Sequence, residues 1–126
     1  MPSPKTVPVQ VRFGDLDPLG HVNHVNFFSI MEVARVEFMR ETSRSLLGQL
    51  VIARSECDHL QEIRGGTRWV DVEVSIEKVG NSSFVVLHEL RVKGNLVGRG
   101  RTVQVVLDDD RRPRRITDDE RVLLQP

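Results

Sequence analysis

One stretch of this chain repeats its apolar residues with the period of a helix, and it stands between stretches that alternate. From about Asn26 to Glu41 the apolar side chains form a single helical stripe. Its members are Phe27, Ile30, Met31, Ala34 and Phe38. The residues before and after this stretch alternate apolar with polar, as half-buried strands do. The pattern therefore favours a sheet that is covered on one face by a single long helix.

The alternating stretches predict five antiparallel strands and an α+β fold. The first strand covers residues 7–13 and contains Pro8, which cannot donate a ladder hydrogen bond, so we expect it at a sheet edge. Four more strands follow the helix, and we expect them to form a meander: residues 50–63 with a bulge or bend, 70–77, 84–92 and 96–107. A tight turn at Gly94-Asn95 precedes the last strand. Gly98 and Gly100, inside that strand, predict sheet curvature or a close crossing of the helix.

Length and composition fit one globular domain. The chain has 126 residues, of which 39% are hydrophobic and 29% charged. We expect a single domain over residues 1–126, with its core within about residues 7–107 and a charged tail at 108–126 that contains a short helix at 117–124.

Charge and composition argue against several function classes. Eighteen basic residues balance eighteen acidic ones, so the chain lacks the basic surplus that a general nucleic-acid binder needs. It has neither an apolar run near the roughly 20 residues of a spanning helix nor a secretory signal at its start. A single cysteine, Cys57, excludes an internal disulfide and a multi-cysteine metal site. We expect a cytoplasmic protein that binds neither nucleic acid nor membranes.

The segment that best suits chemistry is residues 13–28, between the first strand and the helix. It contains two carboxylates, two histidines and two asparagines: Asp15, Asp17, His21, His24, Asn23 and Asn26. The start of a helix presents unpaired N–H groups, which can polarise a carbonyl, and either asparagine can cap it. A carboxylate nearby can attack that carbonyl or activate a water. These are the parts of an acyl-transfer or hydrolysis site, although Asp-x-Asp-Pro is also a common turn sequence.

This segment resembles the signature of the 4-hydroxybenzoyl-CoA thioesterase group of the hotdog-fold superfamily. The matching residues are Asp15, Asp17, Gly20, His21, Val22, Asn23 and Phe27, with Glu32 and Arg35 following in the helix. The order of elements resembles the hotdog fold, in which a five-stranded antiparallel sheet wraps around one long central helix. The resemblance implies an acyl-CoA thioesterase that needs no metal or cofactor, since coenzyme A is part of its substrate.

The resemblance also implies a role for each matching residue. Asp17 takes the place of the catalytic carboxylate, either as nucleophile or as base toward water. The backbone N–H near His24 takes the place of the group that polarises the thioester carbonyl. The other matching residues would shape the loop, brace Asp17 or line the substrate site: Asp15, Gly20, His21, Asn23 and Phe27.

Several residues outside this set have simpler interpretations. Glu32 and Arg35 are spaced for an intrahelical ion pair, and Glu32 is the reserve catalytic residue because some hotdog thioesterases use a helix glutamate. His21 and His24 give only two ligands of a metal site. His88 falls on the apolar face of its strand and is predicted to be a satisfied core or interface histidine. Cys57 is predicted to be a small buried residue.

The sequence allows several assemblies and substrates. The resemblance implies dimers that join sheets edge to edge, or tetramers of such dimers, with sites at the dimer interface. The alternatives to a thioesterase are a non-catalytic acyl-CoA-binding module and a hotdog dehydratase or hydratase. The acyl group can be aromatic, fatty or bound to a carrier protein. Arginines that can hold coenzyme A phosphates are Arg64, Arg68, Arg99, Arg101 and those within 111–115.

Overall fold

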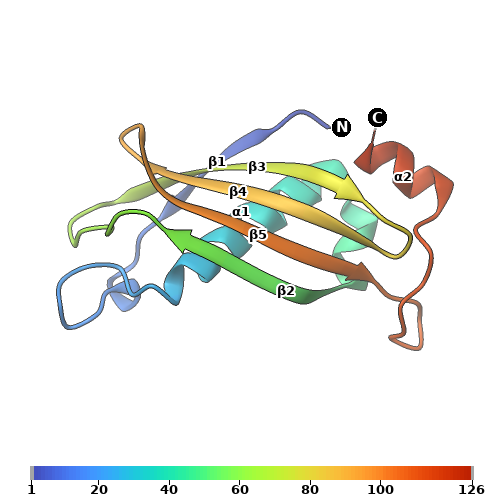
Figure 1. The fold of residues 1–126 in the computed structure, drawn as a ribbon, viewed down its shortest axis with the longest axis horizontal. Coiled ribbons are helices and arrows are strands. Elements are labelled where there is room, and N and C mark those ends of the chain that lie inside the picture. Colours follow the sequence, from blue (N-terminus) through green and yellow to red (C-terminus); the bar gives the residue numbers. More distant parts are fainter. Residues whose placement is uncertain (1, 126) are drawn as a thin grey trace.

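A single long helix crosses one face of a five-stranded antiparallel sheet (Figure 1). The computed structural model describes residues 2–125. The strands are β1 (Lys5–Gln10), β2 (Leu50–His59), β3 (Trp69–Val79), β4 (Ser83–Val92) and β5 (Asn95–Val106). The helices are α1 (Asn26–Thr42), α2 (Asp118–Leu124) and two short 3-10 helices, η1 (Phe13–Asp15) and η2 (Arg44–Gln49).

The predicted apolar stripe is the buried face of α1, and two glycines of β5 let the helix lie close to the sheet. A Cβ atom on Gly98 would lie 3.2 Å from the ring of Phe27. A Cβ atom on Gly100 would overlap the end of the Met31 side chain. The close crossing that these glycines predicted is confirmed.

The strand order is β1-β3-β4-β5-β2, which corrects part of the expected topology. The edge position of β1, predicted from Pro8, is confirmed. The four-stranded meander is wrong, because only β3, β4 and β5 are consecutive neighbours. β2 pairs instead with β5 at the far edge, and the expected bulge falls between Ile52 and Arg54. The turn between β4 and β5 is centred on Lys93 and Gly94, one residue earlier than predicted.

The first strand ends earlier than its alternation predicted. After Gln10 the chain leaves the sheet, and Phe13 is 93% exposed within η1. The cause is the carboxylate of Asp15, which accepts hydrogen bonds from the backbone and the side chain of Arg12 and turns the chain there. Phe13 is therefore a loop residue and not part of the buried strand face.

The charged tail also contributes to the core, which extends beyond residue 107. Ile116 and Leu124 are fully buried, and the predicted short helix is confirmed as α2. The hydroxyl of Thr117 caps α2 by accepting from the N–H of Glu120 at 3.2 Å. Both oxygens of Glu120 accept from the guanidinium of Arg114 at 2.8 Å, so the charges of this segment hold its apolar residues in place.

Candidate active site

The carboxylate of Asp17 is fixed by its own loop at the end of the sheet where α1 begins. Its Oδ1 accepts from the N–H groups of Leu19 at 2.9 Å and His21 at 3.4 Å. Its Oδ2 lies 3.2 Å from Nδ1 of His21. The turn needs glycine at position 20, because Gly20 has a φ of 86°. The structure thus places His21 directly against Asp17.

The loop between β2 and β3, residues 60–68, packs against this Asp17 loop. Nε2 of His21 lies 4.0 Å from a carboxylate oxygen of Glu62, so the imidazole stands between two carboxylates. The backbones of His21 and Arg64 form an isolated bridge, and the N–H of Gly65 donates to the carbonyl of Gly20 at 2.7 Å. No pattern in the sequence pointed to Glu62, because only the fold brings this loop to the site.

Asp15 lies beneath the loop and is buried. Burial alone would raise the pKa of Asp15, but hydrogen bonds from Arg12 outweigh this effect and lower it. The backbone carbonyl of Asp15 accepts from the N–H of Asn23 at 2.8 Å and from the side-chain amide of Asn26 at 3.0 Å. Asp15 therefore joins the loop to the start of α1.

The start of α1 differs from the expected cap. Neither Asn23 nor Asn26 is the N-cap residue, which is Val25. The side-chain oxygen of Asn23 instead caps the preceding turn by accepting from the N–H of Val25 at 3.1 Å. No hydrogen bond among the residues that the structure describes uses the N–H of His24. That group is therefore available to a ligand.

His59, the last residue of β2, completes the surroundings of the helix start. Its ring meets the ring of Phe27 edge-on at 4.5 Å and the ring of His24 at 5.8 Å. Burial, and next the nearby His24, lower the pKa of His59, so its imidazole is neutral near pH 7. Phe27 is only 2% exposed and forms a wall behind His59. The sequence missed His59, because its position depends on the pairing of β2 with β5 opposite Gly98.

Glu32 and Arg35 do not form the expected ion pair. Among residues 2–125, the i,i+3 pair on this helix is Glu37 with Arg40, at 2.9 Å. Arg35 is 8% exposed, and burial lowers its pKa against the opposing effect of Glu32. The buried face of α1 is thus wide enough to include Arg35.

Glu32 and Arg35 instead line a pocket of about 130 Å³ beside the second half of α1. Gln104 closes its polar end, with Nε2 donating to the hydroxyl of Thr102 at 2.5 Å and Oε1 left without a partner. The other walls are apolar and come from α1, η2 and β2: Val36, Met39, Leu47, Leu50, Val51 and Ile52. The rise of the helix from Asn26 to Arg35 is roughly 14 Å, so this pocket and Asp17 lie at different ends of α1.

His88 and Cys57 take no part in the candidate site. His88 is buried as predicted, and its Nδ1 lies 3.4 Å from the carbonyl of Gly100, but its Nε2 has no partner. Cys57 is only half-buried, where a buried residue was expected. Burial raises the pKa of its thiol to about 11, which leaves it protonated and unreactive near neutral pH.

Two features that indicate other classes of protein, a membrane-spanning helix and a cluster of metal ligands, are not found in the part of the chain that the structure describes. Within residues 2–125 no helix is long and apolar enough to cross a membrane. In the same range no three side chains of His, Cys, Asp or Glu lie together as metal ligands, and His21 and His24 have no third partner of this kind.

The sequence profile of the thioesterase-like superfamily matches residues 11–125. This chain belongs to the thioesterase-like superfamily. The fold of this member is similar to that of a predicted thioesterase from Bacillus stearothermophilus, with 30% identity, coverage of 98% of this chain and 95% of that one, and a TM-score of 0.88. It is also similar to a thioesterase from Thermus thermophilus complexed with coenzyme A and Zn, with 37% identity, coverage of 95% and 90%, and a TM-score of 0.87. The predicted hotdog fold is confirmed.

A curated relative of this superfamily member is the uncharacterised protein YsmA of Bacillus subtilis. The two are 31% identical over 85 residues, which are 65% of this chain. The matched stretch spans 56% of the length of YsmA. Superfamily membership supports the expected class, a thioester hydrolase.

Proposed function

We propose that this protein is an acyl-CoA thioesterase in which Asp17 is the catalytic carboxylate. The observation that carries the proposal is the position of Asp17, which is held by His21 beside a helix start where the N–H of His24 is available. Membership of the thioesterase-like superfamily and similarity to a thioesterase complexed with coenzyme A support the same activity.

In the proposed reaction the thioester carbonyl oxygen accepts a hydrogen bond from the N–H of His24. This bond and the positive end of the α1 dipole stabilise the negative charge that develops on that oxygen. With Asp17 as base, a water gives a proton to the carboxylate and its oxygen bonds to the carbonyl carbon. The carbon–sulfur bond then breaks, and coenzyme A leaves as a thiolate.

With Asp17 as nucleophile, its own oxygen bonds to the carbonyl carbon and the thiolate leaves from an enzyme-bound anhydride. Water then cleaves this anhydride and restores the carboxylate. In both routes His21, whose Nδ1 lies 3.2 Å from Oδ2, orients the carboxylate of Asp17, and the thiolate leaves without help from a strong acid.

The acyl group requires a pocket, and we infer that a second copy of the chain supplies it. The pocket beside Arg35 lies too far along α1 to take a short acyl group whose thioester is held at His24 of the same chain. Two-fold antiparallel pairing of the β2 edges would place the His59 end of one strand beside Leu50 of the other. The pocket of the partner would then face Asp17 in a homodimer, or in a tetramer of two dimers.

The substitution Asp17→Asn tests the activity and its assignment together. The wild-type protein should release free thiol from at least one of a panel of acyl-CoAs, and Asp17→Asn should lower the rate at least 100-fold. Asp109→Asn, in an exposed loop at the other end of the molecule, is the matched control and should retain the wild-type rate.

Other outcomes of the same assay identify the competing functions. Water addition without thiol release would mean a hydratase, and saturable binding with neither product would mean a binding module. A near-wild-type rate in Asp17→Asn would overturn the catalytic role of Asp17.

A further inference from the structure

We propose that Arg64, Arg68, Trp69 and Lys93 form a surface that binds the adenine nucleotide of coenzyme A, an inference that rests on the proposed function. These residues come from the loop between β2 and β3, the first residue of β3, and the turn between β4 and β5. We call them the nucleotide surface.

The nucleotide surface is hollowed. Two depressions of about 510 and 690 Å³ adjoin there, since both are lined by Thr67 and Val92. Arg64 borders the first, whereas Arg68, Trp69 and Lys93 border the second. Because they share Thr67 and Val92, we infer that the two depressions form one path along the 60–68 loop, with room for a nucleotide and its phosphates.

One end of this path touches the Asp17 loop. Arg64 is bridged to His21 through the backbone, and Gly65 donates to Gly20. The first depression also includes Gln61 and Glu62, which follow His59 in the chain. In coenzyme A the pantetheine arm separates the thioester from the nucleotide. In our proposal the arm of a thioester held at the start of α1 runs along this loop, because the loop adjoins the Asp17 loop.

The charges along the path suit an anion at its far end. Arg64 is paired with Glu62 at 3.3 Å, and the other acidic residue, Asp71, lies opposite Arg91 in the register of β3 and β4. Arg68 and Lys93 take part in none of the ion pairs that the described residues form. Their guanidinium and ammonium groups are therefore available for phosphate oxygens.

Trp69 adds a surface on which the base can stack. It is 53% exposed although it is the first residue of a strand in the sheet. Stacking on an exposed aromatic ring contributes substantially to the binding of nucleobases. An exposed tryptophan that shares a depression with two unpaired cations suits an adenine that carries phosphates.

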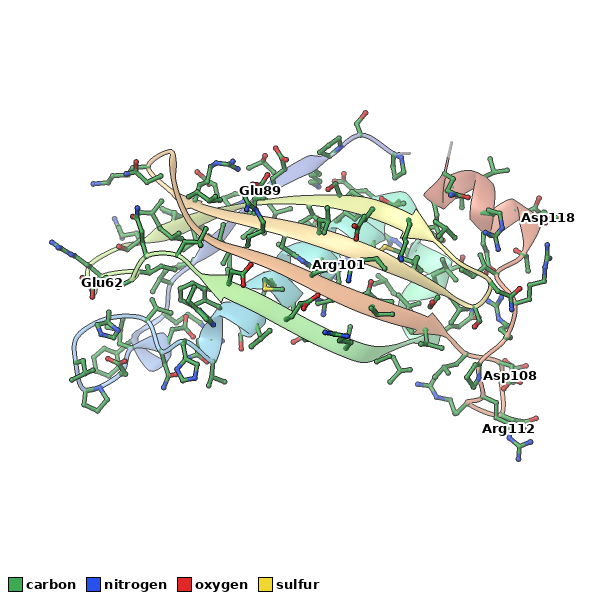
Figure 2. All side chains as sticks on the ribbon, viewed as in Figure 1. Glu62, Glu89, Arg101, Asp108, Arg112 and Asp118 are labelled. Carbon is green, nitrogen blue, oxygen red and sulfur yellow. The ribbon has the colours of Figure 1, made fainter. Side chains whose placement is uncertain are left out.

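Most of the remaining candidate arginines form ion pairs elsewhere. On the sheet, Arg99 bonds to Glu89 at 3.4 Å and Arg101 bonds to Glu77 at 2.7 Å. Arg114 and Arg115 pair with residues of α2. Figure 2 shows Arg101 in the middle of the sheet and Arg112 at the end of the molecule opposite Glu62. The structure thus favours the arginines of the 60–68 loop, because this loop packs against the Asp17 loop.

Trp69 is the only tryptophan of the chain, so its fluorescence reports directly on this surface. Coenzyme A and adenosine 3′,5′-bisphosphate, which lacks the arm, should both quench it in a saturable titration. The variants Arg68→Gln and Lys93→Gln should each raise the Kd of both ligands by about tenfold. Arg112→Gln, an exposed arginine at the far end, is the matched control and should bind as the wild type does.

Kinetics provide the second measurement. In Arg68→Gln and Trp69→Leu the KM for acyl-CoA should rise by about tenfold relative to the KM for the same acyl group on N-acetylcysteamine, which has no nucleotide. Equal changes for the two substrates, or unchanged Kd values in Arg68→Gln and Lys93→Gln, would overturn the nucleotide surface while leaving the thioesterase proposal intact. Quenching that Arg68→Gln weakens, in a protein that hydrolyses no thioester, would support the surface and overturn only the proposed activity.

Discussion

His88 and Arg35 make the interior under the second half of α1 polar. His88 is fully buried in the sheet, and Arg35 approaches it from the helix. Burial, and next the charge of Arg35, lower the pKa of His88 to about 3. The imidazole is therefore neutral in the folded protein at neutral pH, and protonation opposes folding.

This burial predicts a loss of stability on mild acidification. The pKa of His88 in the folded protein lies below the unfolded value of about 6.5. Its protonation therefore does not destabilise the fold above pH 6.5, and the destabilisation grows as the pH falls toward 3. Between pH 7.5 and pH 5 the free energy of unfolding should fall by about 2 kcal/mol. Urea unfolding at a series of pH values and a fixed protein concentration measures this change in the free energy of unfolding. His88→Gln should show a flatter profile over this range, and an equally steep profile in that variant would contradict the assignment.

At this scale the sequence predicted what is local and missed what the fold assembles. Asp15, Asp17 and His21 lie within seven residues, so one loop had to hold them. His59 and Glu62 reach the site only because β2 runs along β5 and its following loop returns to Gly20. The burial of Arg35 escaped prediction because a spacing of three from Glu32 also suits an exposed pair.

At the scale of elements, the contact between α1 and β5 sets the position of the site. Phe27 and Met31 are about one helical turn apart on α1, and they lie over Gly98 and Gly100, which are two residues apart on one face of β5. This contact fixes the start of α1 above the end of β2. His24 and His59 meet as a result.

The substitution Gly100→Ala should therefore destabilise the fold. Its methyl group would displace the end of the buried Met31 side chain, at a cost of about 1–3 kcal/mol in the free energy of unfolding. The same substitution in a Met31→Ala background should cost less, because the space is then empty. Thermal or urea unfolding of the four proteins completes this double-mutant cycle. Equal costs in both backgrounds would show that the two residues do not interact.

The sequence predicted the elements better than their order. Alternation identifies which face of a strand is buried, and Pro8 identified an edge, because both are properties of one segment. Which strand pairs with β2, in contrast, depends on the arrangement of the whole sheet. The 60–68 loop is long enough to cross from β2 to β3 without pairing them, and no residue within β2 indicates this.

On the scale of the whole molecule, the two sheet edges differ. β1 contains Pro8, which leaves a gap in its outward hydrogen-bonding groups. β2 is longer, lacks proline and exposes most of its side chains, including Val51 and Ile52 at 44% and 40%. The β2 edge is therefore the one suited to pair with a second copy of the chain.

A homodimer with shared sites predicts that two inactive variants rescue each other. Asp17→Asn removes the carboxylate, whereas Val36→Trp fills the pocket beside Arg35, so each variant alone should be inactive. After mixing and subunit exchange, half of the molecules are heterodimers, and each of these has one site with an intact carboxylate facing an intact pocket. The mixture should therefore reach about a quarter of wild-type activity, with sedimentation showing a dimer or tetramer throughout. If exchange is demonstrated and the mixture has no more activity than its two components, each chain forms its site alone and the β2 edge does not unite Asp17 with a partner's pocket.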